Sequence, residues 1–185
     1  MRLLYLIRHA SPRVQPDVPA REWVLSEAGI AEAQALARTA AGWGLRALYA
    51  SSEPKARGTA LIISGVTALN VHVVDAFDEL RISDWIGNSD EFNEHVRMIL
   101  DGHEPARGGE SAHEAASRFA VGIRIVEGGP FPAALVSHGR VLTAFLSEAG
   151  LIDDAFEFWR AIPMPGWACI DLDARGAGQP VTFAP

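Results

Sequence analysis

The sequence contains one cysteine, Cys169, and no apolar run that approaches the thickness of a bilayer. A single thiol cannot form an internal disulfide, so nothing favours a disulfide-stabilised secreted fold. Because Cys169 lies in the apolar run 168–170, we expect its thiol to be buried. The N-terminal apolar run 3–7 is too short for the core of a signal peptide. We therefore expect a soluble, cytoplasmic protein.

Positive charge is also scarce in this chain. Sixteen Lys and Arg residues face 23 Asp and Glu residues, which gives a net charge of −7. An acidic protein does not attract nucleic acid or anionic lipid nonspecifically, so we predict neither a nucleic-acid partner nor a membrane partner. A phosphorylated ligand would have to be bound locally, by a few cations whose charges are screened less in a pocket than on the surface.

Internal repeats, low-complexity linkers and strongly alternating strands are absent as well. With 185 residues and 49% hydrophobic content, a single domain over residues 1–185 is the expected organisation. Short apolar runs predict strands at 3–7, 47–51, 71–76, 133–137, 168–173 and 181–183. Most of these runs are continuous, as in strands covered on both faces. Interleaved with helices, they predict an α/β fold, a three-layer α/β/α sandwich with a mostly parallel central sheet.

The helical stretches between the strands begin and end at recognisable residues. Ser26 is a candidate N-cap for a helix that ends near Gly42 or Gly44, and Pro54 can begin the next helix. Ser111 and Glu114 form an S-x-x-E capping box for a helix that ends at 128–129. The last clear helix spans 139–150. The segment 82–109, polar and glycine-rich around a helical stretch at 91–100, is a possible lid over the site.

Two histidines follow predicted strands directly. His9 comes after the run 3–7 and Arg8, and His138 comes after the run 133–137. If these strands are neighbours, both imidazoles face one crevice at the carboxyl ends of the strands, where α/β proteins bind ligands. A single histidine at such a position is as often structural as functional, but a matched pair with cations nearby favours a site.

The cations are Arg8, beside the first histidine, and Lys55 and Arg57, in the first turns of a predicted helix. A phosphoryl group in transit spreads negative charge over its oxygens, and preorganised Arg and Lys donors stabilise that charge. A charged pair on a helix more commonly faces solvent. Only one of Lys55 and Arg57 needs to point inward, and which one does so is open.

Six short motifs in this chain resemble those of the histidine phosphatase superfamily, the phosphoglycerate mutase-like proteins. In order they are Leu4-Tyr5-Leu6-Ile7-Arg8-His9-Ala10, Leu25-Ser26-Glu27-Ala28-Gly29, the block from Ser51 to Ala60, the segment from Glu79 to Gly87, Gly108-Gly109-Glu110-Ser111 and Val136-Ser137-His138-Gly139. Each motif alone is weak evidence, but six in the expected order over residues 4–142 are strong evidence.

The resemblance assigns roles to particular residues. It implies that His9 attacks phosphorus, that Glu79 protonates the leaving oxygen, and that Arg8, Lys55 and His138 hold the phosphoryl oxygens. Backbone N–H groups where Gly139 begins a helix would help to bind the anion. The implied activity is a metal-independent phosphatase without a cofactor, acting on a phosphomonoester or a phosphohistidine. Its substrate would be a small phosphorylated molecule or a phosphoprotein.

Three departures from the family pattern keep other functions open. Ala10 stands where glycine is usual, Lys55 stands where arginine is usual, and Ile86 replaces a common acidic residue. Ala10 and Lys55 keep a catalytically inert phosphate-binding module as an alternative, and a mutase-type phosphotransferase is a second enzyme alternative. Ser11 is a possible further phosphate ligand. The four remaining histidines lack clustering with Cys or carboxylates, so no metal is implied.

Overall fold

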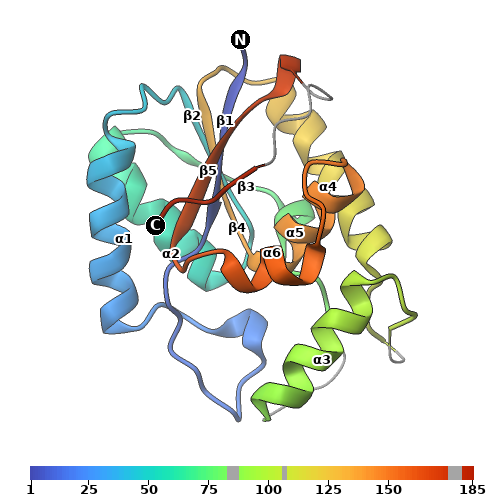
Figure 1. Cartoon of the computed structure of the whole chain (residues 1–185). Coiled ribbons are helices and arrows are strands. Elements are labelled where there is room, and N and C mark those ends of the chain that lie inside the picture. Colours follow the sequence, from blue (N-terminus) through green and yellow to red (C-terminus); the bar gives the residue numbers. More distant parts are fainter. Residues whose placement is uncertain (83–87, 106–107, 175–180) are drawn as a thin grey trace.

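The computed structural model describes residues 1–82, 88–105, 108–174 and 181–185. A five-stranded sheet with the order β3-β2-β4-β1-β5 runs through its centre (Figure 1). The strands are β1 (Leu3–Arg8), β2 (Ala47–Ala50), β3 (Val71–Val73), β4 (Ala133–Ser137) and β5 (Gly166–Asp171). The first four are mutually parallel, and β5 alone pairs antiparallel, with β1. The predicted mostly parallel sheet is confirmed.

Helices cover both faces of this sheet, so the predicted three-layer sandwich is also confirmed. They are α1 (Glu27–Ala40), α2 (Pro54–Thr67), α3 (Ser89–Leu100), α4 (Ala112–Glu127), α5 (Gly139–Glu148) and α6 (Ala155–Ala161). Helices α1 and α2 lie on one face, while α4 and α5 lie on the other (Figure 1). Helix α6, with seven residues, was not predicted.

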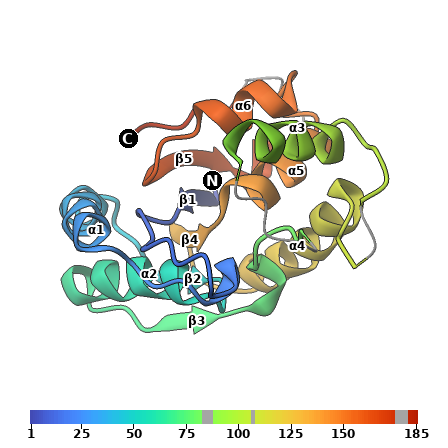
Figure 2. The same ribbon diagram turned by 90° about the horizontal axis from the view of Figure 1, so that it is seen from below.

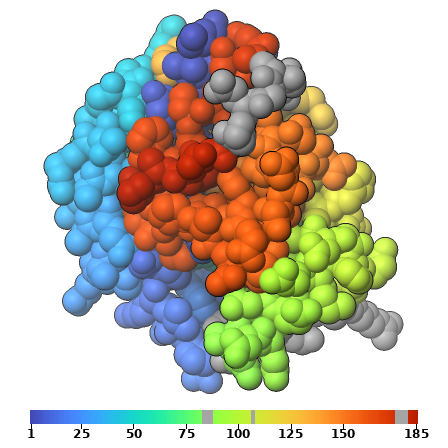
Figure 3. Space-filling view, viewed as in Figure 1, coloured from blue at the N-terminus to red at the C-terminus, as the bar shows by residue number. Residues whose placement is uncertain are grey.

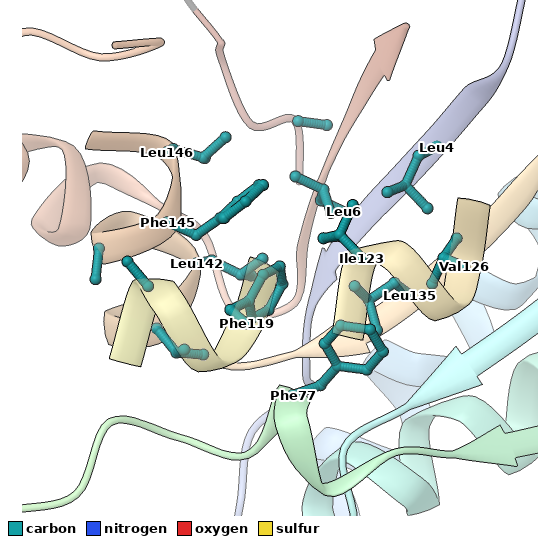
Figure 4. Close-up of a cluster of buried hydrophobic side chains, with 14 of the residues drawn as sticks. Leu4, Leu6, Phe77, Phe119, Ile123, Val126, Leu135, Leu142, Phe145 and Leu146 are labelled. Carbon is teal, nitrogen blue, oxygen red and sulfur yellow. The ribbon is translucent and has the colours of Figure 1, made fainter. Parts of the chain in front are cut away.

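Alternate residues of the buried strands enter two separate cores. Leu4, Leu6 and Leu135 pack against α4 and α5 together with Phe77 and Phe119 (Figure 4). The residues between them enter the second core, which packs against α1 and α2; among them are Ile7, Ala134 and Val136. A strand with apolar contacts on both faces needs apolar residues at every position. This explains the continuous apolar runs from which the strands were predicted.

The predicted helix signals are present as hydrogen bonds. The Ser26 hydroxyl accepts the Gly29 N–H, and Pro54 is the first residue of α2. Ser111 and Glu114 form the complete capping box of α4, whose C-cap is Gly128. These local interactions account for why the helix boundaries could be read from the sequence.

Several predictions about the strands are wrong; the predicted strand 168–173, for example, is β5 at Gly166–Asp171. Residues 181–183 form no strand, and the nearest ladder contact is an isolated bridge between Trp167 and Ala184. The predicted strand 71–76 ends at Val73 and is followed by the short 3-10 helix η2 (Asp75–Phe77). Cys169 is exposed, because β5 is an edge strand whose alternate side chains face away from the cores. Continuous apolar composition did not distinguish this edge from a buried strand.

The carboxyl ends of β1 and β4 point toward the lower end of the molecule, which the loop after β1 and α3 form (Figure 1). In the view from below, the loop after β1 lies toward α2, whereas α3 lies toward α5 and α6 (Figure 2). The possible lid 82–109 contains α3, and its residues 83–87 and 106–107 lie outside the described part of the chain. Within the described ranges, no helix is long and apolar enough to cross a membrane.

Candidate active site

A cleft of about 730 Å³ opens beyond the carboxyl ends of the parallel strands. Its inner end is lined by the end of β1, the start of α2, the segment after η2 and the first turn of α5. Its outer walls come from the loop after β1, from α3 and from α6. In the space-filling view, the loop after β1 and α3 form the end of the molecule at which this cleft lies (Figure 3).

His9 lies at the inner end of the cleft in a defined tautomer. Its Nδ1 is 2.8 Å from the carbonyl oxygen of Ala10. A carbonyl can only accept, so Nδ1 carries the proton and Nε2 keeps its lone pair. Burial lowers the pKa of His9 to about 3, and the nearby charges of Lys55, Arg8 and Arg140 act in the same direction. The imidazole is therefore neutral at neutral pH, as a nucleophile must be.

His138 packs against His9, with ring centroids 5.0 Å apart. Its Nε2 is 2.8 Å from the hydroxyl oxygen of Ser51, and that hydroxyl donates to Asp78 Oδ1 over 2.7 Å. The Ser51 hydroxyl has one proton, which it donates to Asp78, so it can only accept a hydrogen bond from His138. Nε2 of His138 therefore carries a proton and donates it. Nδ1 then keeps a lone pair, and this buried atom has no hydrogen-bond partner in the described part of the chain. Burial, followed by the charge of His9, holds the pKa of His138 well below its ordinary value.

Lys55, and not Arg57, faces the cleft. The Lys55 side chain is buried and donates to the Ala20 carbonyl oxygen over 2.8 Å and to the carboxylate of Glu53. Arg57 is exposed on the outer side of α2. The sequence left open which of Lys55 and Arg57 points inward. The first turn of α2 is oriented so that Lys55 does. Glu53, which also lines the cleft, was not singled out from the sequence.

Arg8 and Arg140 add two guanidinium groups to the inner end. Arg8 is tied to the Ile162 carbonyl oxygen over 2.6 Å, and Arg140 to the Leu80 carbonyl oxygen over 3.2 Å. The Nε atoms of both arginines are buried and, among the described residues, have no hydrogen-bond partner. Native structures pair most of their buried polar atoms. Within the part of the chain that the structure describes, Arg140 Nε has only an ion pair with the Glu79 carboxylate, at 3.5 Å, so both arginines retain donors that can bind an anion in the cleft.

The side chain of Glu79, on the segment after η2, lies against the first turn of α5. Its Oε1 accepts the N–H groups of Leu80 and Val141, both over 2.9 Å. Its Oε2 accepts the backbone N–H of Arg140 over a longer 3.3 Å and lies 3.5 Å from the side-chain Nε of Arg140. Oε2 is therefore the less engaged oxygen, and a proton placed there would leave both short hydrogen bonds of Oε1 intact.

The segment that carries Glu79 is held by an ion pair beneath it. Arg118 on α4 binds both carboxylate oxygens of Glu110, over 2.8 and 2.9 Å, and donates to the carbonyl oxygens of Ala76 and Asp78. Burial of Glu110 disfavours its charge, but the hydrogen bonds and charge of Arg118 outweigh this and lower its pKa. Glu110 is the acidic residue of the Gly108–Ser111 motif, so the motif has a positioning role in this structure.

Two other motifs hold the loop that follows His9. The Thr59 hydroxyl accepts the Ala10 N–H over 3.1 Å, and the Ser11 carbonyl oxygen accepts from the backbone and hydroxyl of Ser26. A Cβ at Gly29 would lie 2.0 Å from that carbonyl oxygen, so only glycine fits there. Ala10 is fully buried. Neither Ala10 nor Ser11 lines the cleft, so the structure gives no support to Ser11 as a phosphate ligand.

The predicted residues His9, Arg8, Lys55 and Glu79 all line the cleft. His138 and Gly139 lie directly behind them as the N-cap and first residue of α5. Sequence reasoning missed Glu53 and Arg140, although each is within two residues of a predicted site residue. The motif positions Ser83, Trp85, Ile86 and Gly87 lie outside the described residues. In the described ranges, no group of three or more His, Cys, Asp or Glu side chains could hold a metal ion.

A neutral imidazole beside three cations and a carboxyl group is an arrangement with the charge and donors to bind a phosphoryl group. The chain belongs to the histidine phosphatase superfamily, branch 1, whose family model matches residues 4–181. A comparison with curated proteins found no match.

Solved structures share the fold across nearly the whole chain. A mycobacterial glucosyl-3-phosphoglycerate phosphatase in complex with VO3 has 22% identity and a TM-score of 0.74, covering 100% of this chain and 97% of that one. YhfR of Bacillus stearothermophilus has 21% identity and a TM-score of 0.76, covering 98% and 95%. Phosphoserine phosphatase of Entamoeba histolytica, with 3-phosphoglyceric acid, has 19% identity and a TM-score of 0.72, covering 100% and 96%.

Proposed function

We propose that this protein is a metal-independent phosphatase that hydrolyses a phosphomonoester through a phosphohistidine on His9. The observation that carries the proposal is the hydrogen bond from His9 Nδ1 to the Ala10 carbonyl oxygen. It leaves an unprotonated Nε2 on a residue that lines a cleft together with Arg8, Lys55 and Arg140. Family membership and the names of the two phosphatases of similar fold support the same reaction class.

In the first step, His9 Nε2 attacks phosphorus and the bond from phosphorus to the ester oxygen breaks. Glu79 transfers a proton from Oε2 to that oxygen, and the alcohol leaves. In the second step, water attacks the phosphohistidine, the Glu79 carboxylate accepts the proton, and inorganic phosphate is released with His9 regenerated. Arg8, Lys55 and Arg140 stabilise the charge on the phosphoryl oxygens in both steps.

Hydrolysis of an aryl phosphate in the presence of EDTA tests the proposal. We expect turnover by the unaltered protein and a loss of at least about a thousandfold in His9→Ala, because the covalent route requires the imidazole. Rapid acid-free quenching after incubation with labelled substrate should trap an alkali-stable phosphoryl group on His9. Retained hydrolysis in His9→Ala would refute the mechanism.

Two other outcomes would support the alternatives raised by the sequence. Tight phosphate binding without hydrolysis or an adduct would indicate an inert binding module. Exchange of phosphate between positions of a phosphorylated sugar acid, dependent on a bisphosphate primer, would indicate a mutase. Thermal unfolding of His9→Ala close to that of the unaltered protein is the control for intact folding.

A further inference from the structure

Glu53 occupies an unusual place at the inner end of the cleft. It is the N-cap residue of α2, yet its side chain makes no capping hydrogen bond. The side chain instead lines the cleft, and the residue is 7% exposed. A carboxylate in a phosphate pocket opposes the bound anion, so its presence there requires a reason.

Its principal contact is with Lys55, which is the only lysine of the chain; the other fifteen basic residues are arginines. Lys55 stands at the position where the family pattern has arginine. An ammonium group has three donors on one atom, whereas a guanidinium is a planar fork. Here the Glu53 carboxylate and the Ala20 carbonyl oxygen take two of the three donors. One donor remains for a phosphoryl oxygen.

The remaining contacts of Glu53 join three parts of the site. Oε1 accepts the Glu79 N–H over 2.9 Å, and Oε2 is 3.9 Å from His138 Nδ1. That nitrogen carries the lone pair left by the Ser51 hydrogen bond. A dianion bound to Lys55 would therefore meet a carboxylate and a lone pair, and both repel it. The other charged groups near this point are Glu79, on the segment after η2, and the guanidinium groups of Arg8 and Arg140.

One added proton removes this conflict. Burial raises the pKa of Glu53, with the charge and hydrogen bond of Lys55 acting against the rise. A dianion that shares Lys55 would weaken the ion pair and add negative charge nearby, and both effects favour protonation. The proton belongs to Glu53 alone, because Oε2 and His138 Nδ1, 3.9 Å apart, lie beyond hydrogen-bond distance.

We propose that Glu53 positions Lys55 and takes up one proton when a phosphate dianion binds. The inference rests on the phosphate site of the proposed function, but it does not depend on hydrolysis. Failure of this inference can therefore be told apart from failure of the proposed phosphatase activity. Proton uptake without turnover would refute only the phosphatase, and turnover without proton uptake would refute only the role of Glu53.

Calorimetric titration with tungstate, a dianion at neutral pH, measures the uptake directly. Binding heats in buffers with different ionisation enthalpies give the number of protons exchanged. We expect Glu53→Gln to take up about one proton fewer per anion than the unaltered protein. Glu79→Gln measures separately the proton that the proposed hydrolysis places on Glu79, and the difference caused by Glu53→Gln should be the same in a Glu79→Gln background. Equal uptake by Glu53→Gln and the unaltered protein would overturn the proposal.

The single lysine provides a second test that needs no substitution. Isotope-labelled lysine gives one side-chain ammonium signal, from Lys55. In the unaltered protein this signal should follow protonation of Glu53 with pH, and tungstate should move that transition to higher pH. A signal that is indifferent to both tungstate and pH would show that Lys55 neither binds the anion nor senses Glu53. This measurement keeps the proposal testable even if Glu53→Gln does not fold.

Discussion

The inner and outer ends of the cleft are built differently. At the inner end, His9, His138 and Lys55 are buried and stand at the ends of strands or the start of a helix, with short hydrogen bonds to neighbouring motifs. At the outer end, Phe92 on α3 and Trp159 on α6 are half-buried aromatic side chains, with ring centroids 6.0 Å apart. The inner end has its geometry fixed by the sheet, and the outer end has its geometry set by loops and short helices.

This difference separates two properties of the proposed enzyme. Substitutions at the inner end should change the rate for every substrate, because every phosphomonoester presents the same phosphoryl group. Substitutions at the outer end should change the choice among substrates, because only the leaving group reaches that far. Single substitutions at the two ends of the cleft test this division between rate and substrate choice.

Arg118→Met should have the largest effect. It leaves the buried Glu110 carboxylate without its main partner and frees the carbonyl oxygens that hold the segment of Glu79. Breaking a buried ion pair in this way costs about 3–5 kcal/mol, so urea unfolding should show a loss of about that size. Hydrolysis should fall for all substrates at once. Arg124→Met, on the exposed face of α4, is the matched control and should change neither property.

The pH dependence of the unfolding free energy that Arg118→Met loses tests the ion pair of Arg118 and Glu110 more directly. The pKa of Glu110 is lowered in the folded protein, so its pairing stabilises the fold above the unfolded pKa. That stabilisation disappears as the pH falls through the lowered pKa of the folded state. The difference in unfolding free energy between Arg118→Met and the unaltered protein should therefore narrow in acid, below the ordinary glutamate range. A difference that widens in acid would contradict the assigned pair.

Ser51→Ala tests the tautomer of His138. The substitution removes the acceptor for Nε2 and the link to Asp78. His138 can then turn or change tautomer, and we expect kcat to fall by about 10–100-fold with little change in KM. Ser52→Ala removes hydrogen bonds to the same carboxylate without touching His138, so its effect should be several-fold smaller. Equal losses in the two variants would show that Asp78, and not the histidine, is the sensitive group.

Gly139→Ala tests the approach of Arg8 to the first turn of α5. An added Cβ would lie 3.1 Å from Arg8 Nε and 3.3 Å from Trp159 Cδ1. The guanidinium must shift by a few tenths of an ångström, and we expect kcat/KM to fall by about tenfold. Gly65→Ala, where nothing lies within 4 Å inside α2, should instead stabilise the protein by about 0.5–1 kcal/mol without affecting turnover. Unchanged kinetics in Gly139→Ala would refute the close approach.

The inner end of the cleft was largely predictable from the sequence, and the reason is physical. A strand followed directly by a histidine fixes where that histidine stands, and caps such as Ser26 and Ser111 fix where helices start. Glu53 and Arg140 were missed because a charged residue at a helix start is usually solvated. Their importance depends on burial, which the sequence does not record. Only the three-dimensional arrangement shows that Oε2 of Glu53 faces His138 and Lys55.

The outer end was not predictable for a different reason. Helix α6 is too short for a recognisable apolar period, and the exposure of Cys169 depends on β5 lying at the edge of the sheet. The place of α6 and the exposure of Cys169 both depend on which segments pack against each other in the folded chain. Trp159 could be placed in the cleft only after α6 itself was seen to lie beside α5 and α3.

Trp159→Leu should have the smallest effect and the most selective one. The indole lines the outer cleft and packs against Phe92 and Phe156. An aromatic leaving group should lose part of its apolar contact, so KM for an aryl phosphate should rise by about threefold to tenfold. KM for ethyl phosphate should stay within about twofold, because a leaving group of two carbons has little surface to contact the indole. Trp43→Leu, in the Tyr5 and Trp167 stack outside the cleft, should leave both KM values unchanged. An equal rise for both substrates in Trp159→Leu would mean that the outer wall positions the phosphoryl group itself, and the division between the two ends would fail.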